Sequence, residues 1–331
     1  MSLTSDHAVE SAGAPTGESS EIAGRSLTAI AWGRLRRDKV ALVAIFALGV
    51  IILIAALAPL IAKLVGVDPN TFNSKVISDS GGLPLGKLGG ISLQHPFGVE
   101  PGTGRDLFAR LLYVSRISLL IAFSATTITV VVGVTVGIIA GYSRGWLDGA
   151  LGRLMDVVLA FPLILIVLAL SNVLTQRLQT TFGLGEVSSR IVYLILVLSL
   201  FGWPYLSRIV RGQVLSLRER EFVESAVSMG AGTPRILFRE ILPNLWAPIL
   251  VYSTLLLPTY IGAEAALSFL GVGLVPPTPS WGAMLADSVR YFTVDWIYLF
   301  IPGTYLFIVV LAFNLLGDSV RDALDPRAGR G

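Results

Sequence analysis

The chain has 331 residues, of which 53% are apolar and only 14% are charged, and its formal net charge is +3. A soluble domain of average composition is about one quarter charged, so this composition indicates a protein folded in lipid and excludes a disordered chain or a nucleic-acid-binding protein. The absence of cysteine and the presence of only two histidines exclude a thiol nucleophile, a thiolate metal site and a histidine-rich metal centre.

Six apolar stretches are long enough to cross a bilayer, which takes about 20 residues in a helix. We expect transmembrane helices at about residues 40–62, 117–141, 157–175, 191–210, 244–270 and 297–317. The first 25 residues are rich in Ser, Gly, Glu and Pro, which predicts a disordered tail. Residues 26–331 are then expected to form one all-α domain with six spans. The first stretch lies too far from the N-terminus for a cleaved signal peptide, so we expect it to be retained.

Basic residues gather in alternate connections between the predicted spans. They are Arg34, Arg36, Arg37 and Lys39 before the first span, Arg144 and Arg153 after the second, Arg208, Arg211, Arg218, Arg220, Arg235 and Arg239 after the fourth, and Arg321, Arg327 and Arg330 at the end. Because basic loops stay in the cytoplasm, both termini are predicted to be cytoplasmic and residues 63–116 to form a long outer loop. The excess of arginine over lysine is typical of a GC-rich bacterium, so we expect a multi-pass protein of a bacterial cytoplasmic membrane.

The connection at residues 211–243, which we call the elbow, predicts two short cytoplasmic helices. Ser216 and Glu219 have the spacing of a capping box, which predicts a helix starting at Leu217. Gly230 is expected to end this helix in a left-handed conformation, because glycine adopts positive φ without steric cost.

Thr233 and Pro234 predict the start of the second elbow helix, as an N-cap followed by proline in the first turn. Pro243 is expected to end that helix. Charges of both signs flank a compact apolar knob in the elbow, so it is either a simple connector on the membrane surface or a docking surface for a soluble partner.

Several short motifs occur in a fixed order along the chain. In the elbow, Glu224-Ser225-Ala226 is followed by Gly230 and by Leu242-Pro243. The other motifs are His95-Pro96-Phe97-Gly98 with Gly104-Arg105-Asp106, residues 263–271 with Pro279-Ser280-Trp281-Gly282, and Gly317-Asp318 with Arg321-Asp322 and Leu324-Asp325-Pro326. Together they resemble the permeases of peptide/nickel ABC importers of the DppC/OppC type. The elbow resembles their EAA loop, with Ser225 in place of an alanine and Glu240 in place of an isoleucine.

This resemblance implies a MetI-like type I importer fold and a permease subunit that forms half of the path for dipeptides or oligopeptides. It implies as partners a homologous second permease, two cytosolic ATP-binding subunits (or one fused chain) and an external substrate-binding protein. The permease itself would be non-catalytic and bind no cofactor, with ATP and magnesium held by the ATPase subunits. The coupling residues that the resemblance implies are Glu221, Phe222, Glu224, Ser225, Ala226, Met229, Gly230, Ala231, Pro234 and Pro243.

Two further features have more than one interpretation. Glu264 is an acid inside a long apolar stretch, where a charge is costly, so we expect it either to form hydrogen bonds in the bundle interior or to act as a gate or a contact on the substrate path. Gly133, Gly137 and Gly141 allow close helix packing, either within the chain or against the second permease. Residues 81–87 match a phosphate-binding loop only in part, because Leu88 replaces the Ser or Thr that would hold magnesium.

Alternative functions remain open at this point. The same machinery imports nickel, haem or glutathione in relatives of this kind. A secondary transporter would show inverted repeats, broken helices or several ionisable groups within the spans. A membrane-embedded enzyme would show a cluster of catalytic side chains, and the sequence contains no such cluster.

Overall fold

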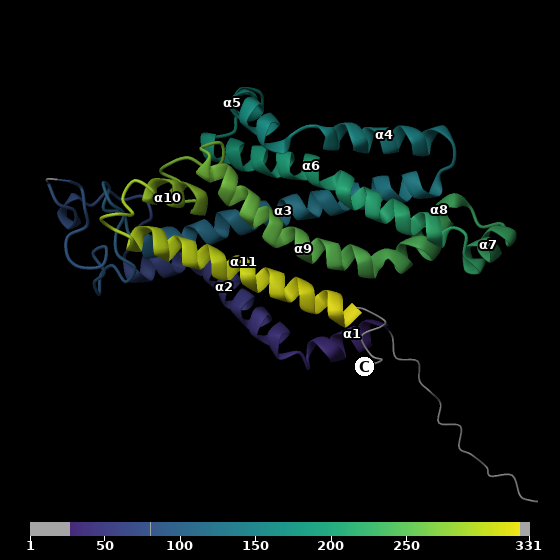
Figure 1. Ribbon diagram of the computed structural model, residues 1–331, viewed down its shortest axis with the longest axis horizontal. Helices are drawn as coiled ribbons and strands as arrows, with labels where there is room; N and C mark the ends of the chain where they lie inside the picture. Colours follow the sequence, from purple (N-terminus) through teal and green to yellow (C-terminus); the bar gives the residue numbers. More distant parts are fainter. Residues whose placement is uncertain (1–26, 80, 325–331) are drawn as a thin grey trace, which may run out of the picture.

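The computed structural model describes residues 27–79 and 81–324 and shows an elongated helical bundle (Figure 1). The helices are α1 Leu27–Leu35, α2 Lys39–Val65, η1 Ser74–Val76, α3 Leu107–Tyr142, α4 Trp146–Ala160, α5 Leu163–Phe182, α6 Glu186–Leu217, α7 Glu221–Ser228, α8 Thr233–Arg235, the π-helical turn η2 Ile236–Ile241, α9 Leu242–Phe269, α10 Trp281–Ser288 and α11 Ile297–Leu324. Among the described residues, six helical stretches are long and apolar enough to cross a membrane. The predicted tail at residues 1–25 lies outside the described residues.

Five predicted spans coincide with long helices, and the third is wrong at its beginning. The stretch 157–175 crosses a break between α4, which ends at Ala160, and α5, which begins at Leu163. Pro162 causes the break, because the residue before a proline avoids the helical conformation, and Phe161 is extended with φ −79° and ψ 130°. The sequence is apolar across the break, so hydropathy alone did not reveal it.

The packing of α3 against α6 forms the centre of the bundle. A Cβ atom added to Gly137 would lie 2.7 Å from the Cβ of Val210, and one added to Gly141 would lie 2.6 Å from the Cβ of Val214. Neither distance is tolerated, so the two backbones approach as closely as only glycine allows. Gly133 meets α6 in the same way. This stripe of small residues is therefore occupied by packing within the chain.

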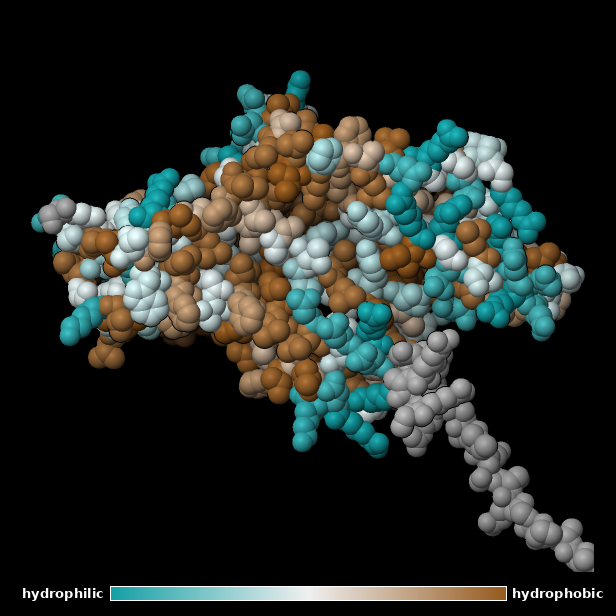
Figure 2. All heavy atoms as spheres, in the orientation of Figure 1, coloured by the Kyte–Doolittle hydropathy of each residue, from teal (hydrophilic) through white to brown (hydrophobic). Residues whose placement is uncertain are grey.

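The rest of the bundle is apolar both inside and outside. A buried cluster joins α2, α3, α6, α9 and α11 through residues such as Leu48, Ile121, Leu194, Ile261 and Val309. Many other large apolar side chains of the same helices are exposed, and Figure 2 shows them covering the middle of the molecule. Apolar surface of this extent fits contact with lipid or with another membrane subunit.

The two ends of the bundle differ in structure (Figure 1). One end carries residues 66–106, which we call the α2–α3 lobe, together with α10, and the other end carries α7 and α8 of the elbow. The predicted outer loop at 63–116 is shorter than expected, because α3 already begins at Leu107. Asp106 starts this helix as its N-cap, since its carboxylate accepts a hydrogen bond of 2.7 Å from the N–H of Ala109.

Candidate functional site

The first half of the elbow is a continuation of α6 followed by a separate short helix. α6 runs through Ser216 to Leu217, and α7 begins at Glu221 without a side-chain cap. The predicted capping box is therefore wrong. The reason is tertiary packing: Val210 and Val214 fill the space over the glycines of α3, and this contact keeps α6 helical beyond the point where Ser216 would have left the helix.

Gly230 ends α7 as predicted. Its φ is +80°, in the left-handed region. The N–H of Gly230 donates to the carbonyl of Val227 at 2.9 Å, and the N–H of Ala231 donates to the carbonyl of Ala226 at 3.0 Å. This pair of bonds is the Schellman motif, which satisfies the last carbonyls of a helix. A Cβ at Gly230 would meet no atom within 4 Å, so the space beyond it is open.

The second half of the elbow leads directly into a membrane helix. Gly232, and not Thr233, is the N-cap of α8, and Pro234 lies in the first turn as expected. The chain stays helical through η2 into α9, so the prediction that Pro243 ends the second helix is wrong. Proline is tolerated in a first helical turn because its missing N–H has no partner there, and the π-helical turn just before it absorbs the change of register.

The elbow has a buried base and an exposed apolar tip. Val223 and Ala226 face inward, and Val223 packs with Val214, Ile236 and Ile241 in a cluster that joins α6, α7, η2 and α9. Phe222 and Met229 face outward with 39% and 80% of their surface exposed. The other predicted coupling residues Glu221, Glu224, Ser225, Gly230, Pro234 and Pro243 are also exposed, and Ala231 is partly exposed.

Two arginines that the sequence did not single out for this role fix the elbow to its neighbours. Arg218 donates to the carbonyl of Gly141 at 3.0 Å, at the negative end of α3. Arg211 donates two hydrogen bonds, of 2.6 and 2.9 Å, to the two carboxylate oxygens of Asp148 on α4. These bonds hold the pKa of Asp148 below its usual value. The partners are more than sixty positions apart in the chain, so no local sequence signal pairs them.

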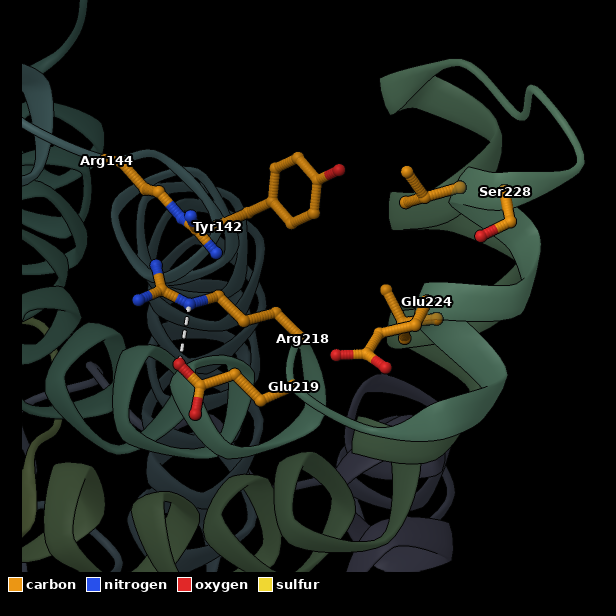
Figure 3. A pocket seen from close by; sticks show the side chains of 8 residues that line it. Tyr142, Arg144, Arg218, Glu219, Glu224 and Ser228 are labelled. Atoms are coloured by element: carbon orange, nitrogen blue, oxygen red, sulfur yellow. Dashed lines mark ion pairs between the residues drawn. The ribbon is translucent and has the colours of Figure 1, made fainter.

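A hollow of about 610 Å³ separates α7 from the end of α3 (Figure 3). Tyr142 and Arg144 lie on one side, and Glu224 and Ser228 of α7 lie on the other. Arg218 lines the same hollow, 3.8 Å from the carboxylate of Glu219. α7 is therefore set apart from the bundle on this side, and the hollow between them is lined by charged groups of both signs.

Glu264 lies far from the elbow and is fully buried. One of its carboxylate oxygens accepts a hydrogen bond of 2.7 Å from the hydroxyl of Ser118 on α3, and the other accepts one of 2.8 Å from Ser268 on α9. Ser268 in turn accepts a bond from the N–H of Leu274, in the segment that leads to α10. Both carboxylate oxygens of Glu264 therefore have a hydrogen-bond donor within the chain.

The fold resembles that of two solved chains of the MetNI methionine ABC transporter in inward-facing conformations. The first has a TM-score of 0.50 and 19% identity, and the match covers 63% of this chain and 93% of that one. The second has a TM-score of 0.51 and 18% identity, and the match covers 65% of this chain and 96% of that one. That likeness shows the fold alone, which is the MetI-like type I importer fold. The family model for inner membrane components of binding-protein-dependent transport systems matches residues 133–330, and the model for the N-terminal membrane domain of oligopeptide transport permease C matches residues 26–76.

The chain belongs to this family of binding-protein-dependent transport permeases, and it is a permease subunit of an ABC importer. It is 38% identical to the dipeptide transport permease DppC of Alkalihalophilus pseudofirmus, over 90% of this chain and 89% of the relative. It is 35% identical to the oligopeptide transport permease OppC of Bacillus subtilis, over 96% of each chain. It is also 38% identical to the glutathione transport permease GsiD of Escherichia coli, over 89% of each chain. Family membership rejects the secondary-transporter alternative.

Proposed function

We propose that this permease carries dipeptides or oligopeptides into the cell, and that the elbow couples it to cytosolic ATP-binding subunits. The exposed apolar tip on a rigid base supports this role most directly. A single exposed apolar side chain is common in proteins, but here Phe222 and Met229 are both exposed, and Met229 directly precedes Gly230, which has open space beyond it. A tip of this shape can enter a groove on a partner without steric conflict, as docking of a helix into a groove requires.

The base of the elbow suits the transmission of movement. Val223 packs against α6 and α9, and Arg218 binds the end of α3. A displacement of the tip by an ATPase therefore moves these membrane helices with it. Such a rigid coupling between a docked element and packed helices is a two-state mechanism, and the permease needs no catalytic group or cofactor for it. ATP and magnesium belong to the ATP-binding subunits in this proposal.

The names of the relatives support this substrate class, since they give dipeptides, oligopeptides and glutathione. A second, homologous permease would complete the path, and an external binding protein would deliver the peptide. Glutathione is the second candidate substrate, because the glutathione permease GsiD and the dipeptide permease DppC are both 38% identical to this chain. Uptake of labelled dipeptide, longer peptide and glutathione by the reconstituted importer distinguishes the three.

The coupling role is tested at Gly230 with a matched pair of variants. Asparagine tolerates the left-handed conformation better than other non-glycine residues, whereas arginine adds both strain and bulk at the tip. We expect Gly230→Arg to insert in the membrane but to lose co-purification with the ATPase and most of the uptake. Gly230→Asn should retain more of both. If Gly230→Arg couples and transports like the parent protein, the elbow is only a connector.

The orientation is a separate part of the proposal, with both termini in the cytoplasm. Because the chain lacks cysteine, single cysteines report accessibility cleanly. Lys87→Cys in the α2–α3 lobe should react with an impermeant maleimide in intact cells, and Ser228→Cys in α7 should react only after the membrane is opened. Both positions are exposed. The reverse pattern of labelling contradicts the orientation.

A further inference from the structure

An apolar groove lies where α1 meets α9 and the end of α11. Its volume is about 270 Å³, and its largest wall residues are Trp32 and Leu35 of α1, Trp246 and Leu250 of α9, and Val320 and Leu324 of α11. All six side chains are apolar or carry only an indole N–H, so the groove offers almost no hydrogen-bonding partner to water. It suits a hydrocarbon chain.

The position of α1, and with it one wall of the groove, is fixed by polar contacts. Arg34 donates to the carbonyl of Ala323 at 3.4 Å. Asp38, just after α1, accepts a hydrogen bond of 2.7 Å from Ser319 on α11 and caps α2 through the N–H of Val40 at 2.9 Å. The groove is therefore a defined feature between anchored helices.

Basic side chains stand at the edge of the groove. The guanidinium of Arg36 lies 5.3 Å from the centre of the Trp32 ring, which is itself a wall of the groove. Arg37 and Lys39 follow within one turn, and all three are exposed, with no ion pair among the described residues. Nearby α11 adds the exposed Arg321, Asp318 and Asp322. With Arg34 and Asp38 included, five basic residues face three acidic ones in this region.

The groove also lies at the depth of a membrane surface. It is formed by the first turns of α9 and the last turns of α11, both candidate spans, and it contains two tryptophans, which favour the boundary between hydrocarbon and headgroups. Apolar pockets with basic edges at this depth bind anionic headgroups. We propose that the groove binds one anionic phospholipid, with an acyl chain between Trp32 and Trp246 and its phosphate beside Arg36, Arg37 and Lys39.

Other occupants fit the groove less well. Residues 1–26 precede α1, and they contain few large apolar residues. Residues 325–331 follow Leu324, and their sequence is Asp-Pro-Arg-Ala-Gly-Arg-Gly. Neither segment supplies the hydrocarbon that the walls require. A second membrane subunit has no reason to match the basic edge unless it is acidic there, whereas every anionic phospholipid carries a negative phosphate.

The test uses the assembled importer in nanodiscs that contain traces of a photoreactive lipid. Two probes carry the same diazirine-labelled acyl chain, one on phosphatidylglycerol and one on phosphatidylcholine. We expect phosphatidylglycerol to label peptides of α1 and the first turns of α9 several-fold more strongly. Arg36→Gln with Arg37→Gln should remove this preference, because each basic side chain near a membrane surface contributes up to about five-fold to the binding of an anionic lipid. Leu250→Trp should fill the groove and reduce labelling by both probes.

Arg153→Gln is the matched control, because Arg153 is exposed on α4, on the opposite side of the bundle from α1 (Figure 1). It should leave the labelling of α1 and α9 unchanged. Equal labelling by the two probes overturns the proposal, as does a charge variant that labels like the parent protein. Absence of labelling at this groove with both probes shows that another subunit covers it, which also overturns the proposal.

Discussion

The two ends of the molecule differ in where their charged side chains lie: one end buries a cluster of them, and the other exposes them on α7. In the α2–α3 lobe, Glu100 is 1% exposed and accepts hydrogen bonds from Thr103 at 2.7 Å, Arg105 at 2.5 Å and Tyr298 at 2.7 Å. Arg110 lies 3.8 Å from the same carboxylate. In the elbow, Glu221 and Glu224 are exposed and the apolar Met229 points outward.

This difference indicates what each end is built for. The lobe buries one cluster of charges, Glu100 with Arg105 and Arg110. Burial alone would raise the pKa of Glu100, but the charge of Arg110 and the three hydrogen bonds hold this pKa below its usual value. This buried network fixes the lobe onto the ends of α3 and α11. At the tip of the elbow, by contrast, apolar side chains and carboxylates are exposed together, as on a surface that binds a partner. Substitutions at the two ends should therefore affect different properties.

The largest effect is expected at Glu100. Glu100→Gln removes the charge that compensates Arg105 and Arg110, and breaking a buried ion pair in this way costs about 3–5 kcal/mol. Thermal unfolding in detergent should shift strongly downward. Glu186→Gln is the control, because the Glu186–Arg190 pair has a carboxylate that is 61% exposed and is worth less than about 1 kcal/mol. Equal shifts for the two variants would contradict the buried network.

The second largest effect is expected at Glu264, in the interior of the bundle. Glu264→Leu leaves the hydroxyls of Ser118 and Ser268 without their acceptor, at a cost of about 1–3 kcal/mol. Glu264→Gln retains an acceptor and adds a donor, so it should stay close to the parent protein in unfolding temperature and within a few-fold in transport. If the glutamine and leucine variants behave alike, the carboxylate is not needed as a hydrogen-bond acceptor.

Local sequence patterns predicted the positions of most helices, because long apolar runs have few alternatives in lipid. They failed where contacts distant in sequence decide the outcome. Ser216 lies in a capping-box pattern, yet α6 continues through it because Val214 packs onto Gly141. Pro243 was expected to end a helix but lies in the first turn of α9. In the candidate site, Gly230 was predictable because its φ depends on local sterics alone.

The polar networks were not predictable in the same way. Arg105 and Asp106 belong to a recognisable motif, but the pairing of Glu100 with Tyr298 joins residues 198 positions apart. The bond between Glu264 and Ser118 spans 146 positions. The sequence shows that a charge within a span needs a partner, but only the packing of α3 against α9 and α11 shows which residue provides it.

The third effect concerns coupling and leaves stability unchanged. Met229 is 80% exposed, so Met229→Asp should not alter unfolding, yet it places a charge where an apolar groove is proposed to bind. We expect ATPase co-purification and uptake to fall about ten-fold, which corresponds to about 1.4 kcal/mol. Met229→Leu should retain both. Leu93→Asp, at a fully exposed position in the lobe, should leave ATPase co-purification unchanged. If Met229→Asp keeps the ATPase co-purification and uptake of the parent protein, the exposed tip of the elbow is not a docking surface.

The smallest effect is expected at the pair between Asp148 and Arg211. The hydrogen bonds from Arg211 lower the pKa of Asp148 from 3.8, its ordinary value. A lowered folded-state pKa contributes stability that is complete above the unfolded value and is lost as the pH falls through the folded value. Both side chains are partly exposed, so solvent screening limits the contribution to less than about 1 kcal/mol. Asp148→Asn should lower stability slightly at pH 7.

As the pH falls below 3.8, the difference between the parent protein and Asp148→Asn should diminish, because the parent carboxylate becomes increasingly protonated and its advantage is lost. Unfolding curves of both proteins between pH 7 and pH 2.5 test this convergence. Glu100→Gln provides the contrast: its buried carboxylate also has a lowered pKa, so its larger difference from the parent should also shrink only at acid pH. If Asp148→Asn and Glu100→Gln lowered the stability of the protein by the same amount, the greater burial of Glu100 would have no effect on the strength of its ion pairs.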